Sequence, residues 1–179
     1  LTSFFLDYLN IKVDGFPKES EAYDVFRKMY EENGYSNEEI LKEILHYAEF
    51  YHTFLYGSKK YSSKVNKCLE NLRRLNQSTV YVFLFRVFDD YHNPNESHMT
   101  ETELEKVLQF LLNYTIRRMV CEIGSNSLRG LYKTLYARVF NRPENKNNYY
   151  DSIVSFFIQL ASRDVLIKDD EFKQGLKYN

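Results

Sequence analysis

Apolar residues recur every three or four positions along most of the chain, which is the spacing that places side chains on one face of an α-helix. The pattern is strongest over residues 20–32, 36–57, 62–76, 100–124, 126–140 and 149–163. Shorter helices are expected over residues 1–9 and in the tail after residue 164. With only 6 Gly and 3 Pro to interrupt these runs, the sequence predicts an all-α fold, a single multi-helix domain of about seven or eight helices over residues 1–179.

Two of these helices carry a clear start signal. Ser36 is followed three residues later by Glu39, and Thr100 by Glu103. In this spacing the hydroxyl and the carboxylate each bind a free backbone N–H of the first helical turn, so both pairs predict a capping box.

Residues 80–88 are apolar on every side and are rich in β-branched and aromatic residues, which suits either a buried strand or a buried helix. No second run offers a pairing partner, and a lone strand is not stable. We therefore expect a central helix here.

Composition narrows the classes of function. The formal net charge of −1 gives no global field that would attract nucleic acid. No apolar stretch reaches the length of about 18–20 residues that spans a bilayer. Cys68 and Cys121 form no spacing motif, which indicates a reduced, cytoplasmic protein rather than a disulfide or metal site.

The chain begins without Met, and we expect it to be a domain excised from a longer multidomain protein.

Two adjacent arginines interrupt the apolar run of the helix over residues 100–124. At about 100° per residue, Arg118 and Glu122 fall on the stripe that holds Leu104, Leu108 and Leu111. We expect Arg118 to be a structural arginine paired with Glu122, or with a carboxylate of another helix. Arg117 points away from the stripe and is expected to be a solvated surface charge.

A basic, tyrosine-containing stretch follows. Seven basic residues against two glutamates lie between Arg117 and Lys146. A basic face interleaved with tyrosine suits a phosphate backbone, although a solvated helix face has the same composition. The candidate nucleic-acid contacts are Arg117, Arg129, Lys133, Arg138 and Arg142. A second basic patch with the same two interpretations comprises Lys59, Lys60, Lys64 and Lys67.

Catalytic patterns are weak. His46 and His52 are six residues apart on one helix and so do not share a face for a metal ion. His92 and His98 flank Pro94, but no Cys or Asp cluster joins them. With no glycine-rich phosphate loop and no nucleophile motif, we predict no catalytic residue, no metal and no cofactor in this chain.

The order of short motifs resembles a known family. The segment "FFLDYLNIKVDGFPKESEAYDVFRKMY" is similar to the start of the helical middle region of GmrSD-type restriction endonucleases. The matching residues there are Tyr8, Leu9, Lys12, Pro17, Tyr23, Phe26 and Arg27. The run "LLNYTIRRMVC" with Arg117 and Arg118, followed by "SNSLRGLYKTL", resembles the paired-arginine hallmark of that family. The tail "DVLIKDDEFKQGL" resembles its "DDEF" segment, here Asp169 to Phe172.

The resemblance implies a role for a longer protein. Members of the family join an amino-terminal ParB-like domain that binds and hydrolyses nucleotide, a helical region, and a carboxy-terminal HNH-type nuclease that cuts modified foreign DNA. It implies that this chain is the non-catalytic bacterial spacer, with the flanking domains as partners, DNA as a further contact, and nucleotide and divalent metal held elsewhere. Two alternatives stay open from the residues: a helical protein-interaction module, and a metal-dependent enzyme that uses the histidines.

Overall fold

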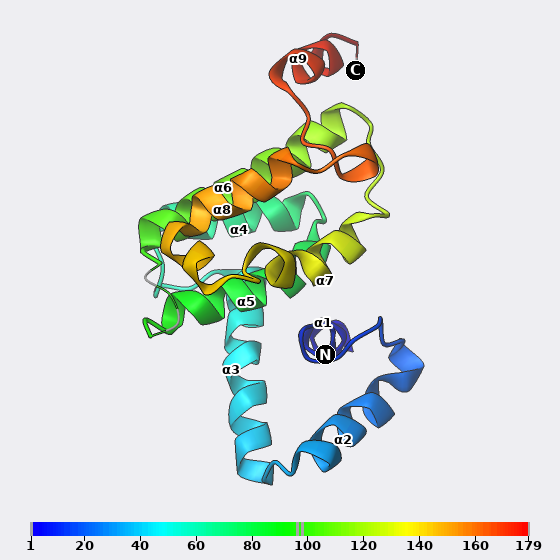
Figure 1. Cartoon of the computed structure of the whole chain (residues 1–179), viewed down its shortest axis with the longest axis vertical. Helices are drawn as coiled ribbons and strands as arrows, with labels where there is room; N and C mark the ends of the chain where they lie inside the picture. The colour runs from blue at the N-terminus through cyan, green and yellow to red at the C-terminus, as the bar shows by residue number, and fades with distance from the viewer. Residues whose placement is uncertain (1, 96, 98, 179) are drawn as a thin grey trace.

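The computed structural model describes residues 2–95, 97 and 99–178, and within them every regular element is a helix (Figure 1). The α-helices in this part of the chain number nine, slightly more than the sequence predicts. They are α1 (Thr2–Lys12), α2 (Ala22–Asn33), α3 (Asn37–Tyr56), α4 (Ser63–Arg74), α5 (Tyr81–His92), α6 (Glu101–Val120), α7 (Leu128–Val139), α8 (Tyr149–Ile158) and α9 (Asp169–Tyr178). Short 3-10 turns η1 (Glu19–Glu21), η2 (Ser78–Val80), η3 (Pro143–Asn148) and η4 (Ser162–Asp164) connect some of them.

Local sequence signals set several helix ends. The Ser36 hydroxyl accepts from the Glu39 backbone N–H while the Glu39 carboxylate accepts from the Ser36 N–H, and Thr100 and Glu103 do the same. Both predicted capping boxes are therefore confirmed, and they begin the two longest helices. Gly34 ends α2 at φ 66°, a left-handed conformation that a residue without Cβ adopts without strain.

The ambiguous segment over residues 80–88 is helical, as expected, and forms the centre of the core. From residue 81 to residue 88 of α5 only Arg86 is not buried. Arg86 extends to the end of α1, where its Nη2 donates to the Ile11 carbonyl at 2.6 Å. Helices α1, α3 and α7 pack around α5, so its apolar residues need no strand partner.

A buried carboxylate ties this central helix to later parts of the chain. Asp90 is 5% exposed and accepts hydrogen bonds from the Tyr136 hydroxyl at 2.8 Å, the Tyr149 hydroxyl at 2.9 Å and the Lys146 ammonium at 2.8 Å. Burial opposes the charge on Lys146, but the hydrogen bonds to Asp90 and Tyr136 raise its pKa. A charge at this depth is stable because it is paired and hydrogen-bonded.

Some predicted boundaries are wrong. Helix α6 ends at Val120, so the backbone has left the helix before Gly124. Helix α7 begins at Leu128, two residues after the predicted start at residue 126. Helix α8 ends at Ile158, five residues before the predicted end at residue 163, and Ile158 is 66% exposed.

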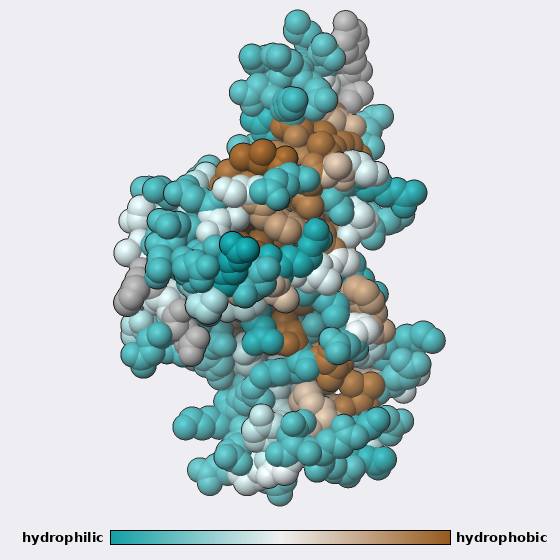
Figure 2. Space-filling view, in the orientation of Figure 1, coloured by the Kyte–Doolittle hydropathy of each residue, from teal (hydrophilic) through white to brown (hydrophobic). Residues whose placement is uncertain are grey.

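The molecule is elongated. Helices α2 and α3 form one end in Figure 1, the layer of α4, α6 and α8 lies across the middle, and α9 stands at the opposite end. Apolar side chains gather where α9 joins the other helices (Figure 2), and a groove there is lined by Phe110, Ile158 and Leu166, among others. Among the described residues, none of the helices combines the length and the apolar character that crossing a membrane requires.

Candidate nucleic-acid interface and an adjoining cleft

Arg118 lies inside the fold, on the buried stripe of α6, with 2% of its surface exposed. Its Nη1 donates to the Tyr114 hydroxyl at 3.1 Å and to the Arg163 carbonyl, and its Nη2 donates to the Gly124 carbonyl at 2.6 Å. Tyr114 in turn donates to the Asp164 carbonyl at 3.0 Å. One guanidinium thus holds the segment after α6 and the turn η4 against the same helix.

The predicted ion pair between Arg118 and Glu122 is not formed in the described structure. Because α6 ends at Val120, Glu122 no longer follows the helical spacing that would place it beside Arg118. Its backbone has φ 53°, and its side chain is exposed. Two backbone carbonyls and the Tyr114 hydroxyl accept from its terminal nitrogens instead, while its Nε has no hydrogen-bond partner among the described residues. Sequence spacing does not reveal such a partnership.

Arg117 is also engaged within the fold, so the prediction of a solvated surface charge is wrong. Its side chain is only 19% exposed. It donates from Nη2 to Asp169 Oδ1 at 2.6 Å and from Nη1 to the Ile167 carbonyl at 3.0 Å. Its Cζ lies 5.0 Å from the centre of the Phe172 ring. The side chain that points away from the α6 stripe therefore contacts α9, which is 52 residues later in the chain.

Arg129 and Lys133 lie on one side of α7 and face the loop between α1 and α2. The Lys133 ammonium donates to the Asn10 side chain at 3.2 Å, to the Val13 carbonyl at 3.0 Å and to the Gly15 carbonyl. Burial lowers its pKa. The Arg129 Cζ lies 5.2 Å from the ring centre of Phe16. Lys133 anchors the loop and is not available to a phosphate backbone.

Arg138 and Arg142 are exposed, but they do not extend the surface formed by Arg129. Arg138 is nine residues after Arg129, which places it on the opposite side of α7 at about 100° per residue. Its Cζ lies 4.6 Å from the centre of the Phe156 ring of α8. The structure therefore does not bring Arg117, Arg129, Lys133, Arg138 and Arg142 onto one basic face.

Three of the four lysines of the second basic patch lie beside carboxylates. Lys60 pairs with Glu49, Lys64 lies 3.6 Å from Glu105, and Lys67 lies 3.1 Å from Glu70. These pairs lie on the surface and contribute little stability. They also remove most of the net positive charge that a phosphate backbone would need.

Two of the histidines are hydrogen-bonded to side chains of the fold. His46 Nε2 lies 2.8 Å from Asp89 Oδ1, and His92 Nε2 lies 2.6 Å from the Tyr61 hydroxyl. Burial lowers the pKa of His92, and the nearby His46 adds to the effect. His98 lies outside the described residues. Within those residues, no three His, Cys, Asp or Glu side chains are grouped so that they could hold a metal ion.

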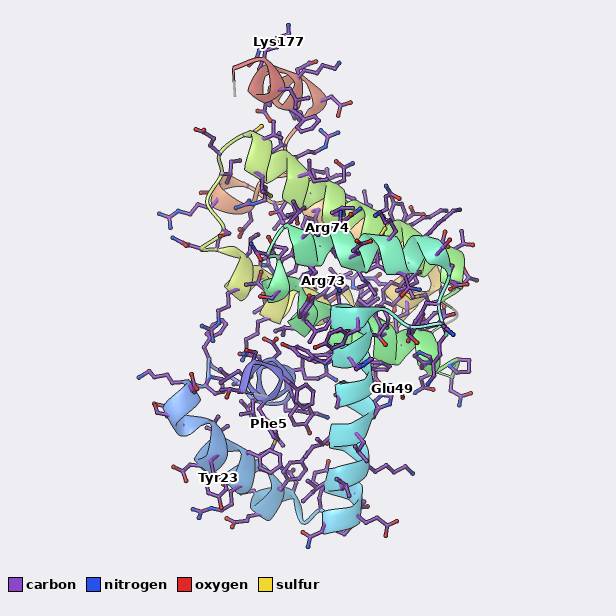
Figure 3. The ribbon with its side chains drawn as sticks, turned by 180° about the vertical axis from the view of Figure 1, so that it is seen from behind. Phe5, Tyr23, Glu49, Arg73, Arg74 and Lys177 are labelled. Atoms are coloured by element: carbon purple, nitrogen blue, oxygen red, sulfur yellow. The ribbon has the colours of Figure 1, made fainter. Side chains whose placement is uncertain are left out.

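A cleft that the sequence did not reveal adjoins the Arg129 side of α7. It has a volume of about 500 Å³ and lies between α1, the end of α3, the segment from α4 to α5, and α7. The charged residues in its wall are Asp7, Arg73, Arg129 and Lys133. Arg73 lies on the side of α4 that faces α3 and α1 (Figure 3), and it donates to the Leu55 carbonyl. These residues come from segments up to 126 positions apart, so no local motif marks them.

Tyr8 and Lys12 of the amino-terminal motif are structural as well. Tyr8 is fully buried, and its hydroxyl donates to Glu43 Oε2 at 2.9 Å. Tyr30 donates to the same oxygen at 2.9 Å, and Lys12 pairs with the other oxygen of that carboxylate. One glutamate of α3 therefore joins α1 and α2, and the three groups that donate to its carboxylate compensate its partial burial.

Comparison of the chain with protein-family models, with curated proteins and with solved structures gives no match.

Proposed function

We propose that the chain is the non-catalytic helical positioning domain of a GmrSD-like, modification-dependent DNA restriction nuclease that acts in the bacterial cytoplasm in phage defence. The observation that carries this proposal is the contact between its two most family-like segments. Arg117 of the paired-arginine run binds Asp169 and stacks on Phe172 of the "DDEF" run. Motifs that are distant in sequence meet in space, as expected if both serve to build one scaffold.

The use of the arginines supports a positioning role over a substrate-binding role. Arg118 donates only to groups of the chain itself, and it is buried. Arg117 holds the first turn of α9 to the end of α6. A rigid link between the last helix and the core would fix the direction in which a following domain leaves. In this proposal, nucleotide and divalent metal are bound by the neighbouring domains.

The sequence of the gene on both sides of the region that encodes this chain tests the proposal. Sequencing on both sides should reveal an upstream region with the features of a ParB-like nucleotide-binding domain and a downstream HNH-type nuclease region. A reading frame that encodes neither of them would contradict the proposal.

A biochemical test uses the purified chain. It should neither cut modified or unmodified plasmid DNA nor hydrolyse nucleoside triphosphates. An activity that co-purifies with the chain and is abolished by a point substitution within it would overturn the non-catalytic role.

A helical protein-interaction module is the second candidate, favoured by exposed apolar side chains on α3. Leu41 and Leu45 are 58% and 60% exposed and lie one turn apart. An apolar pair of this kind is typical of a helix that contacts a partner. In the first proposal the partner is a flanking domain, whereas in the second it is a separate protein, so the same sequencing experiment distinguishes them.

A further inference from the structure

The cleft beside α1 has the size of a small-molecule site. Its volume of about 500 Å³ falls within the range of roughly 300–1,000 Å³ that ligand pockets usually have. Side chains of α1, α3, α4 and α7 form its walls, together with the η2 turn and Phe16. Because those helices also surround the core, the site is built on rigid elements.

Two arginines in the wall have donors that the fold leaves unused. Arg73 uses one nitrogen for the Leu55 carbonyl, and within the described residues its other nitrogens have no hydrogen-bond partner. Arg129 makes no hydrogen bond to any described residue; its guanidinium lies over the Phe16 ring and interacts electrostatically with Asp7. A guanidinium presents its donors in a planar fork that matches the oxygens of phosphate or carboxylate. Lys133 adds positive charge but is occupied by the loop carbonyls.

Asp7 supplies an acceptor in the same wall. Among the described residues its carboxylate has neither a hydrogen bond nor an ion pair, although it is only partly exposed. Burial raises the pKa of Asp7 to about 7, and the charge of Arg129 offsets part of that effect. A partly buried carboxyl group that has no hydrogen-bond partner in the fold can accept a hydrogen bond from an N–H or O–H of a ligand.

The remaining wall is aromatic and hydroxylated. Tyr51 and Phe16 contribute aromatic rings to the wall, and Ser78 and Thr79 contribute hydroxyls, of which the Thr79 hydroxyl accepts from Gln77. The charges favour an anion, since three cationic side chains face one carboxyl group. The volume and the rings favour more than a bare phosphate ion.

We propose that this cleft binds a small phosphate monoester that carries a ring with a hydrogen-bond donor, such as a sugar phosphate or a nucleoside monophosphate. Arg129 and Arg73 hold the phosphate, and Asp7 accepts from the ring substituent. The inference does not depend on the proposed positioning role, because it concerns only residues of this chain.

Isothermal titration of the purified chain tests the proposal with four probes: inorganic phosphate, ribose 5-phosphate, AMP and adenosine. At least one of the two esters should bind ten-fold or more tightly than inorganic phosphate, and adenosine, which lacks the anion, should not bind. The ester that binds more tightly identifies the source of the phosphate as a sugar or a nucleotide.

Variants locate the site. Arg129→Gln should lower the affinity for the ester by roughly ten- to a hundred-fold, which is the usual effect of losing hydrogen bonds to a charged group. Arg27→Gln, an exposed arginine on α2 outside the cleft, is the matched control and should leave affinity unchanged. Asp7→Ala should reduce the ratio of the affinity for the ester to the affinity for inorganic phosphate, because the hydrogen-bond acceptor for the ring is lost.

Two results would overturn the proposal. One is the absence of saturable binding of either ester up to about 5 mM, near the weak limit of specific affinity. The other is equal affinity of the Arg129→Gln and Arg27→Gln variants for the ester. Circular dichroism of both variants ensures that the comparison is made between folded proteins.

Discussion

Arg117 and Asp169 connect the end of α6 to the first turn of α9, with Nη2 and Oδ1 2.6 Å apart. The hydrogen bond from Arg117, and then its charge, lower the pKa of Asp169. Gly175, one turn and a half further along α9, lies so close to α6 that a Cβ there would be 2.9 Å from the Val120 carbonyl oxygen. Two separate contacts therefore hold the last helix in place.

Removal of the first contact should loosen α9 without unfolding the core. Arg117→Ala is expected to lower the local free energy of opening of α9 by about 1–2 kcal/mol, since it removes hydrogen bonds and a cation–π contact. Hydrogen exchange of the amides of α9 should accelerate by roughly five- to thirty-fold, with the amides of α5 unchanged. Gly175→Ala should have a similar effect because the added methyl group meets backbone.

Lys173→Ala is the matched control for α9. Lys173 lies on the same helix, is 70% exposed, and is 3.9 Å from Asp170. Its loss should leave the exchange rates of α9 almost unchanged. Equal exchange in the Arg117→Ala and Lys173→Ala variants would show that Arg117 does not hold the helix.

DNA binding by the isolated chain should depend only weakly on salt. Arg129 and Arg138 lie on opposite sides of α7, so few phosphates can be contacted from one face. At about 0.9 per phosphate contact, the slope of log K against log salt should be no steeper than about −2. Fluorescence anisotropy with a short labelled duplex at several salt concentrations measures this slope. A steeper slope that becomes shallower in an Arg129→Glu, Lys133→Glu double variant would contradict this expectation and indicate that these residues do contact DNA.

The stability of the protein should reflect the burial of Asp7. Its unfolded carboxyl group loses a proton near pH 3.8, whereas the folded pKa is about 7. Between these values the folded state holds the extra proton, so the contribution of Asp7 to stability falls as pH rises and remains unfavourable above pH 7.

Asp7→Asn should remove this penalty. The variant should be more stable than the natural protein by about 1–3 kcal/mol near pH 8, and the difference should shrink towards pH 5. The cleft admits water, which keeps the gain below the full effect of the shift. Urea-induced unfolding at the two pH values measures it, and an equal difference at both would contradict a raised pKa of Asp7.

Much of the fold follows from local sequence. The capping boxes at Ser36 and Thr100 and the helical nature of residues 80–88 depend on neighbouring residues, and the structure has them as expected. The partner of Arg118 could not be predicted in this way. It depends on where α6 ends, and the backbone carbonyls of Gly124 and Arg163 carry no sequence signal.

The cleft was missed for a related reason. Asp7, Arg73 and Arg129 each belong to an ordinary helix, and only tertiary packing places them around one space. For Arg117 the predicted direction is correct but the predicted exposure to solvent is wrong. Helical periodicity correctly points it away from the α6 stripe, but a later helix covers that side, so direction on one helix does not establish exposure to water.

The stability of Arg118 variants tests most directly the claim that the paired arginines are scaffold. Arg118→Ala should lower the free energy of unfolding by about 2–4 kcal/mol, because it removes a buried side chain and leaves the buried Tyr114 hydroxyl and the carbonyls of Gly124 and Arg163 without their donor. Arg27→Ala, at an exposed site on α2, should change it by less than about 0.5 kcal/mol. A loss of that size in the first variant alone is the result that we predict from urea-induced unfolding, and equal stability of the two variants would contradict the account.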